Sequence, residues 1–151
     1  DVDPLAAIER MTEGEIETLV LHEEGELAAG RMLGESWPQM LARLRGKRAE
    51  IFARAVKDNL ADCLVTLPAL LRRGSVDSLH FWFSTFDGLR RDMFPRLHAA
   101  YSSRVGAGDT AILAAAADAG QAHFAALGRC LLTMDESAIE ALSHQTGTIA
   151  L

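Results

Sequence analysis

Apolar residues recur along this chain at the three- and four-residue spacing of a helix surface, and no segment sustains the alternation of a strand. Alanine and leucine dominate, and β-branched residues are sparse. The pattern predicts an all-α fold. No internal repeat or low-complexity linker interrupts it, so residues 1–151 are expected to form a single domain, either a multi-helix bundle or a globin-like packing of helices.

Start and stop signals divide the chain into helices. The start signals are Asp3-Pro4, the capping boxes Thr12-x-x-Glu15, Ser36-x-x-Gln39 and Thr133-x-x-Glu136, and Asp109 after the loop 106–108. The stop signals are Gly34, Gly74, Pro68 and Pro95. We therefore expect helices over about residues 13–33, 37–66 with a bend at Gly46, 67–73, 76–93, 95–104, 110–132 and 134–144. Small residues surround most of the 110–132 helix, which should be central or form a tight interface.

Most of the aromatic residues lie in one segment, LHFWFSTFDGLRRDMF at 79–94. On a helix of about 100° per residue, Trp82 and Phe83 fall on a stripe that is predicted to face the core. Phe81 points to the opposite side, with His80 beside it. Three interpretations of Phe81 stay open: another element covers it, it forms a self-association interface, or it lines a ligand pocket.

Arg90 is the polar anomaly of this segment because it falls inside the apolar stripe. A guanidinium buried without a partner is very costly. Arg90 must therefore reach solvent, pair with a carboxylate of another helix, or bind an anionic ligand.

Composition narrows the class of protein. Of 151 residues, 49% are hydrophobic and 24% charged, which indicates a folded domain, and the net charge of −6 argues against binding nucleic acid or an anionic membrane. No transmembrane run or signal peptide is visible. Cys63 and Cys130 lie in apolar helical surroundings and are expected to be buried free thiols of a reducing, cytoplasmic compartment. The missing initiator methionine suggests a domain excised from a longer chain.

Candidate chemistry is sparse. There is no nucleophile motif, phosphate-binding loop or HExxH pair, so we expect no catalytic or metal-binding residues. His22 precedes a run of glutamates, but adjacent residues on a helix do not face one another. A haem with one axial histidine would best use His98, and His80 second. The candidate ligand-binding residues are His80, Trp82, Phe83, Arg90, His98 and His123, and the candidate interface residue is Phe81.

The segment MLARLRGKRAEIFARAVKDNL, followed by LPALL, resembles the helical N-terminal sensor domains of bacterial stressosome and histidine-kinase regulators, some of which have a non-haem globin fold. Leu44, Arg48 and Ile51 fit the family pattern over residues 37–100, while Ala55 or Val56 replaces the tryptophan expected there. The resemblance implies a cytoplasmic signal-transduction domain, and no functional residue of the family carries over.

Three functional hypotheses follow. The first is a non-catalytic regulatory or sensory domain that forms a homodimer and relays a signal to a covalently linked or partner signalling domain. The alternative is a protein that binds haem, another tetrapyrrole or a hydrophobic small ligand between the aromatic helix and the alanine-rich helix. The third, a helical enzyme, would require Arg90, His80 or His123 to converge with carboxylates.

Overall fold

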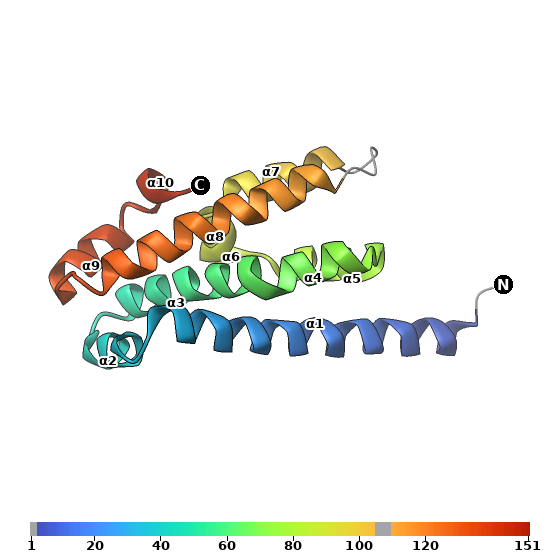
Figure 1. Ribbon diagram of the computed structural model, residues 1–151, viewed down its shortest axis with the longest axis horizontal. Helices are drawn as coiled ribbons and strands as arrows, with labels where there is room; N and C mark the ends of the chain where they lie inside the picture. Colours follow the sequence, from blue (N-terminus) through green and yellow to red (C-terminus); the bar gives the residue numbers. More distant parts are fainter. Residues whose placement is uncertain (1–2, 105–109) are drawn as a thin grey trace.

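The computed structural model describes residues 3–104 and 110–151, without the side chain of Arg104, and the described residues contain helices but no strand (Figure 1). The all-α prediction is confirmed. The helices are α1 (Pro4–Leu33), α2 (Ser36–Arg43), α3 (Lys47–Ala61), η1 (Asp62–Thr66), α4 (Leu67–Arg73), α5 (Val76–Thr85), α6 (Gly88–Asp92), α7 (Pro95–Arg104), α8 (Ala111–Leu131), α9 (Glu136–Ser143) and α10 (Thr146–Ile149). None of the described helices is both long and apolar enough to cross a membrane.

Helix α1 runs for 30 residues along one side of the molecule (Figure 1). Asp3 caps its start by accepting a hydrogen bond from the N–H of Leu5, and Gly34 ends it as expected. The predicted start at Thr12 is wrong. The Thr12 hydroxyl donates to the carbonyl of Ile8 one turn earlier, so this residue serves the helix interior and not a cap.

The predicted helix over 37–66 is interrupted instead of bent. Leu44 and Gly46 adopt extended backbone between α2 and α3. Two carboxylates of α9 stabilise this break: Glu136 accepts from the N–H of Arg45 at 2.6 Å, and Glu140 accepts from the N–H of Ala49 at 3.2 Å. The box predicted at Ser36 is also wrong, because α2 begins at Ser36 without a side-chain cap.

Helix α3 continues through the π-helical turn η1 into α4, so the end predicted before Pro68 is wrong. Leu67 has helical dihedral angles, and its N–H bonds to the carbonyl of Asp62, five residues earlier. Pro68 has no N–H to donate in this continuous helix, and it directly follows the π turn. The predicted short helix 67–73, closed by Gly74 in the left-handed conformation, is confirmed. Single π turns inside helices occur frequently at functional sites.

The aromatic segment forms two helices where one was predicted over 76–93. Phe86 and Asp87 leave the helical region after α5, and Gly88 takes a positive φ of 54° before α6 continues. The core prediction nevertheless holds, because Trp82 and Phe83 are both buried. Helix α7 then begins at Pro95.

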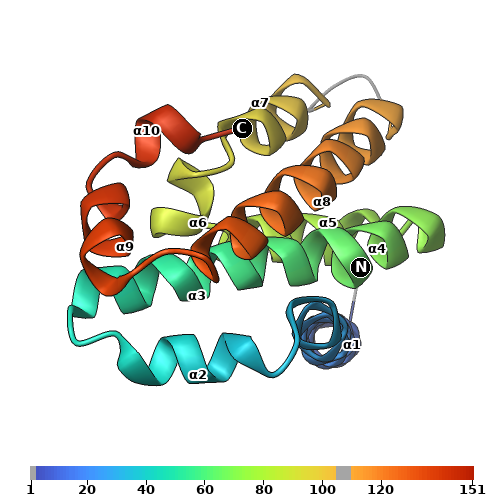
Figure 2. The ribbon, with the colours of Figure 1, turned by 60° about the vertical axis from the view of Figure 1, so that its left-hand side comes forward.

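Helix α8 lies between α3 and α7 (Figure 2) and forms one of the tight interfaces that its small residues predicted, while its other side is exposed. A side chain at Gly120 would place its Cβ 2.7 Å from the sulfur of Cys63, so only glycine allows this approach. The predicted loop 106–108 and the cap Asp109 lie outside the described residues. The last predicted helix is capped by Asp135, which accepts from the N–H of Ala138, and not by Thr133.

Candidate functional site

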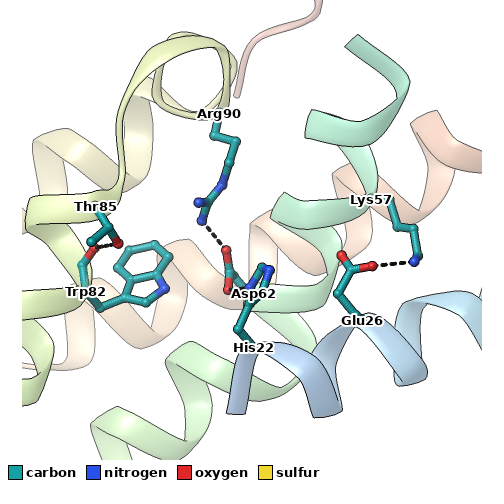
Figure 3. Close-up of polar contacts among 7 residues, drawn as sticks. All are labelled: His22, Glu26, Lys57, Asp62, Trp82, Thr85 and Arg90. Atoms are coloured by element: carbon teal, nitrogen blue, oxygen red, sulfur yellow. Dashed lines mark hydrogen bonds and ion pairs between the residues drawn. The ribbon is translucent and has the colours of Figure 1, made fainter. Parts of the chain in front are cut away.

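A polar cluster lies where α1 crosses the junction of α3 and η1. The helices approach so closely that a Cβ on Gly25 would lie 2.5 Å from the carbonyl oxygen of Ala61. We define the crossing cluster as the charged and titratable residues gathered around this point: His22, Glu26, Lys57, Asp58, Asp62 and Arg90. Its members come from α1, from α3 and η1, and from α6, and Figure 3 draws all of them except Asp58.

Asp62 is the most deeply buried member, with 1% of the residue exposed. One carboxylate oxygen lies 3.1 Å from Nδ1 of His22, and the other accepts a hydrogen bond from the guanidinium of Arg90 (Figure 3). The Arg90 guanidinium carbon also lies 5.8 Å from the ring centroid of Trp82 and 5.7 Å from that of Phe86. The carboxylate of another helix therefore neutralises Arg90, and two aromatic faces add a cation–π contribution.

The other half of the crossing cluster is crowded with acidic groups. Glu26 accepts a hydrogen bond from Lys57 through Oε2, while its Oε1 is buried without a partner. Burial raises the pKa of Asp58 to about 6, and the neighbouring Glu26 contributes through a hydrogen bond and through its charge. The pKa of His22 is raised by its hydrogen bond to Asp62, against an opposing effect of burial. The ionisation of Asp58 therefore moves toward neutral pH, and that of His22 moves above its ordinary pKa of 6.5.

Among the described residues, His22, Glu26 and Asp58 are the one group of three or more histidine, cysteine or acidic side chains close enough to share a metal ion. One ligand atom from each lies within 4.8 Å of the other two. His22 and Glu26 are one turn apart on α1, and Asp58 faces them from α3. The ligand set, an imidazole and two carboxylates, is chemically suited to a divalent transition metal.

The outward side of α1 is the largest apolar feature of the surface. Among the described residues, eight of the eleven exposed large hydrophobic side chains lie on α1: Leu5, Ile8, Met11, Ile16, Leu19, Val20, Leu27 and Met32. We define the outer stripe as the six that fall within a sector of about 120° at about 100° per residue: Leu5, Ile8, Ile16, Leu19, Val20 and Leu27. The buried side of the same helix carries Thr18, Leu21, Gly25, Ala29 and Leu33. Helix α1 therefore has two apolar faces, and only one of them packs on the body of the protein.

Phe81 lies in a groove between the first half of α1 and α5. It is half-buried, and the groove, of about 830 Å³, is also lined by Met11, Glu13, Ser78 and His80. Helix α1 is therefore the neighbour on the second side of the aromatic helix, the side that sequence reasoning left open.

The family model of the C-terminal domain of DUF6866, a family of unknown function, matches residues 1–149. The chain belongs to this family. No curated protein and no solved structure matches it. A globin-like arrangement and a resemblance to sensor domains therefore stay predictions for the DUF6866 domain.

The predicted ligand residues of the DUF6866 domain have different surroundings. Nδ1 of the exposed His80 lies 2.6 Å from the Tyr101 hydroxyl, and Nε2 of His123 lies 2.8 Å from the carbonyl of Ile149. His98 is exposed on α7. Phe83 stacks on Tyr101 with ring centroids 3.8 Å apart. The structure brings Trp82 to Arg90, whereas none of these three histidines joins a described metal-ligating group.

Sequence reasoning missed most of the crossing cluster. His22 was compared with its immediate neighbours, although the informative signals are His22-x-x-x-Glu26 and Asp58-x-x-x-Asp62, each one helical turn apart. The expectation for the cysteines is correct for Cys63, which is buried, and wrong for Cys130, which lies on the exposed side of α8.

Proposed function

We propose that the DUF6866 C-terminal domain is a regulatory domain that self-associates through the outer stripe of α1 and relays this state to a neighbouring module. The observation that carries the proposal is the concentration of exposed apolar side chains on one face of one helix. Contiguous apolar surface of this kind marks interaction sites, because monomeric proteins seldom leave it exposed. Helix α1 lies along one edge of the molecule, so one side of it faces away from the other helices (Figure 1).

The spacing of the outer stripe supports an antiparallel pair of α1 helices. Thr12 and Glu23 are polar positions near the centre of its sector, and Glu9 and Glu26 lie toward the two edges. When one α1 is reversed against another so that Ile16 meets Leu19 of the partner subunit, Ile8 meets the partner subunit's Leu27. In the same register, Glu23 meets the partner subunit's Thr12, whose hydroxyl would have to leave the carbonyl of Ile8 to donate to it. Glu9 meets the partner subunit's Glu26, whose charge Lys57 of its own chain offsets. A parallel pair would instead place two Glu23 carboxylates together, which like-charge repulsion disfavours.

The flanks of the stripe make self-association dependent on salt. Glu9, Glu13 and Glu24 are exposed beside it and form no ion pair with any residue that the structure describes. Two acidic helices repel each other at low ionic strength, and added salt screens this repulsion. The dimer should therefore tighten as sodium chloride is raised.

Sedimentation equilibrium over a range of concentrations tests the proposal. Leu19→Asp, at a side chain 62% exposed, should shift the protein to monomer. Ile51→Asp, at a side chain 47% exposed on α3, is the matched control and should leave association unchanged. A wild-type monomer at every concentration and salt level would refute self-association.

Disulfide cross-linking tests the direction of the helices. The Ile8→Cys and Leu27→Cys variants are each made in a Cys130→Ser background, mixed and oxidised. An antiparallel pair should give a disulfide-linked dimer that joins residue 8 of one chain to residue 27 of the other. A parallel pair would give the product of two Ile8→Cys chains, because residues 8 and 27 are then about 28 Å apart along the axis at 1.5 Å per residue.

The groove beside Phe81 supports a second candidate function, the binding of haem or another hydrophobic small ligand. Pockets of this size with an aromatic wall and a few polar groups are typical ligand sites. Titration with haem, followed by visible absorption, and with a hydrophobic fluorescent probe tests this function. Binding should weaken in Phe81→Ala, and no response to either compound would contradict it.

A further inference from the structure

We infer that the crossing cluster binds a divalent first-row transition metal ion, with His22, Glu26 and Asp58 as protein ligands. The three side chains come from two helices that Gly25 allows to approach, and their ligand atoms lie within 4.8 Å of one another. Ligands around a tetrahedral zinc ion at about 2.0–2.2 Å lie about 3.3–3.6 Å from one another. Side-chain movements that shorten each separation by roughly 1–1.5 Å would therefore close the site.

The hydrogen bond to Asp62 orients His22 for this role. An ionised carboxylate only accepts hydrogen bonds, so Nδ1 of His22 carries the proton that Asp62 Oδ1 receives at 3.1 Å. In the neutral imidazole the lone pair is then on Nε2, for which the structure gives no hydrogen-bond partner among the described residues. Metal-ligating histidines are commonly held in this way by a carboxylate on the opposite nitrogen. Asp62 is therefore a positioning residue, and the imidazole sets the site apart from a cluster of carboxylates.

The carboxylates of Glu26 and Asp58 also have oxygen atoms that could bind a cation. Oε1 of Glu26 is buried without a hydrogen-bond partner when Asp58 is ionised, and Glu26 is one of the more enclosed acidic side chains of α1. The carboxyl groups of Asp58 and Glu26 lie within 4.8 Å of each other, and Lys57 is the cation bound to Glu26. A divalent ion between the two carboxyl groups would attract both in their ionised form.

The donor set selects the class of metal. Imidazole with carboxylates suits Zn²⁺, Co²⁺, Mn²⁺ and Fe²⁺, whereas Ca²⁺ and Mg²⁺ prefer oxygen ligands alone. Three protein ligands leave coordination positions for water. Because two ligands lie on α1 and one on α3, the ion would clamp α1 onto the body of the domain. The inference does not rest on self-association, since the crossing cluster lies on the inner side of α1 and the outer stripe on the other.

The test uses the chain after treatment with EDTA and dialysis. Co²⁺ titration should produce a visible d–d absorption that saturates at one equivalent, and calorimetry with Zn²⁺ should give the same stoichiometry. Asp58→Asn and Glu26→Gln preserve side-chain volume, and each should weaken the affinity at least tenfold. Asp62→Asn should weaken it about 10- to 100-fold, the range for groups that orient a metal ligand. Circular dichroism establishes that each variant is folded.

Two further variants separate this site from adventitious binding. His144 and Glu140 form an exposed pair one turn apart, with Nε2 and Oε1 3.2 Å apart, and no described third ligand joins them. His144→Gln is therefore the matched control and should leave binding unchanged. Lys57→Met removes the cation that competes for Glu26 and should raise the affinity for Zn²⁺. The inference is overturned if Co²⁺ gives no saturable absorption, if Asp58→Asn binds like the wild type, if His144→Gln abolishes binding, or if Lys57→Met weakens it.

Discussion

Asp62 and Arg90 form an ion pair between η1 and α6, 28 residues apart in the chain, and the carboxylate is almost completely enclosed. The pair links the helix that crosses α1 to the aromatic segment, because the same guanidinium lies against Trp82. Asp62 also holds His22, so one buried carboxylate joins three parts of the fold.

Removing one partner of this pair should be strongly destabilising. Arg90→Met leaves Asp62 with His22 as its remaining charged neighbour, and breaking a buried ion pair costs about 3–5 kcal/mol. We expect about 3 kcal/mol, the lower end of this range, because the Arg90 side chain is 22% exposed. Urea denaturation monitored by circular dichroism measures the loss.

The double variant is the control for this prediction. Asp62→Asn combined with Arg90→Met removes the uncompensated charge, so it should be more stable than Arg90→Met alone. If the double variant were the less stable of the two, the isolated Asp62 charge could not be the cause of the loss.

Gly25→Ala should destabilise the domain despite the higher helix propensity of alanine. The new Cβ would lie 2.5 Å from the carbonyl oxygen of Ala61, and backbone cannot yield as a side-chain end can. Forced overpacking costs about 1–3 kcal/mol. Gly30, on the same helix, has no atom within 4 Å of the corresponding position, so Gly30→Ala should be stabilising by about 0.5–1 kcal/mol. Thermal unfolding compares the two, and equal effects would exclude a tight crossing at Gly25.

Stability should decline with rising pH across the mildly acidic range in metal-free protein. The folded pKa of Asp58, about 6, exceeds its ordinary value of 3.8, so the folded chain binds more protons between these values. The unfolding free energy then falls as pH rises through this window. The raised pKa of His22 acts in the same direction: its contribution is complete below 6.5 and is lost as pH rises through the folded pKa.

Urea denaturation at pH 4.5 to 8 in the presence of EDTA measures this dependence. In a plot of unfolding free energy against pH, Asp58→Asn should reduce the slope at the acidic end. His22→Gln should reduce the slope at the higher pH values. His144→Gln, at an exposed histidine, is the control and should reproduce the wild-type curve. A wild-type stability that rises steadily across this range would contradict the prediction.

The two thiols should differ in reactivity. Burial raises the pKa of the Cys63 thiol far above its ordinary value, so almost no thiolate forms there, whereas Cys130 is exposed. Ellman's reagent should therefore titrate one thiol rapidly in the native protein and two after unfolding. Cys130→Ser should abolish the rapid phase, and a rapid phase that persists in this variant would show that Cys63 is accessible.

The sequence predicts the helices better than their interruptions because periodicity is local and the interruptions depend on distant groups. The core positions of Trp82 and Phe83 follow from helical spacing alone. The break between α2 and α3, by contrast, is stabilised by Glu136 and Glu140, about 90 residues away in the chain. The continuation through Pro68 depends on the π turn, for which no sequence signal was recognised.

The candidate site was partly foreseeable. Arg90 was recognised as anomalous from its place in the apolar stripe, and a carboxylate partner on another helix was one expected answer. The identity of that partner could not be predicted, because Asp62 is 28 residues away and the chain offers many acidic residues. His22, 40 residues from Asp62, meets it only once α1 has packed against η1.

The attachment of α1 has a consequence for the order in which the native fold opens. Ion pairs and hydrogen-bonded polar pairs connect Glu17 to Arg73, His22 to Asp62 and Glu26 to Lys57, so one continuous rod of α3, η1 and α4 holds α1 antiparallel to itself. Leu21 and Leu33 are the only large apolar side chains among the buried residues of α1, whereas α8 buries Leu113, Phe124 and Leu131 and packs on α3, α7 and η1. Backbone amides of α1 should therefore exchange with deuterium well before those of α8, with α1 separating as a unit while the remaining helices stay folded.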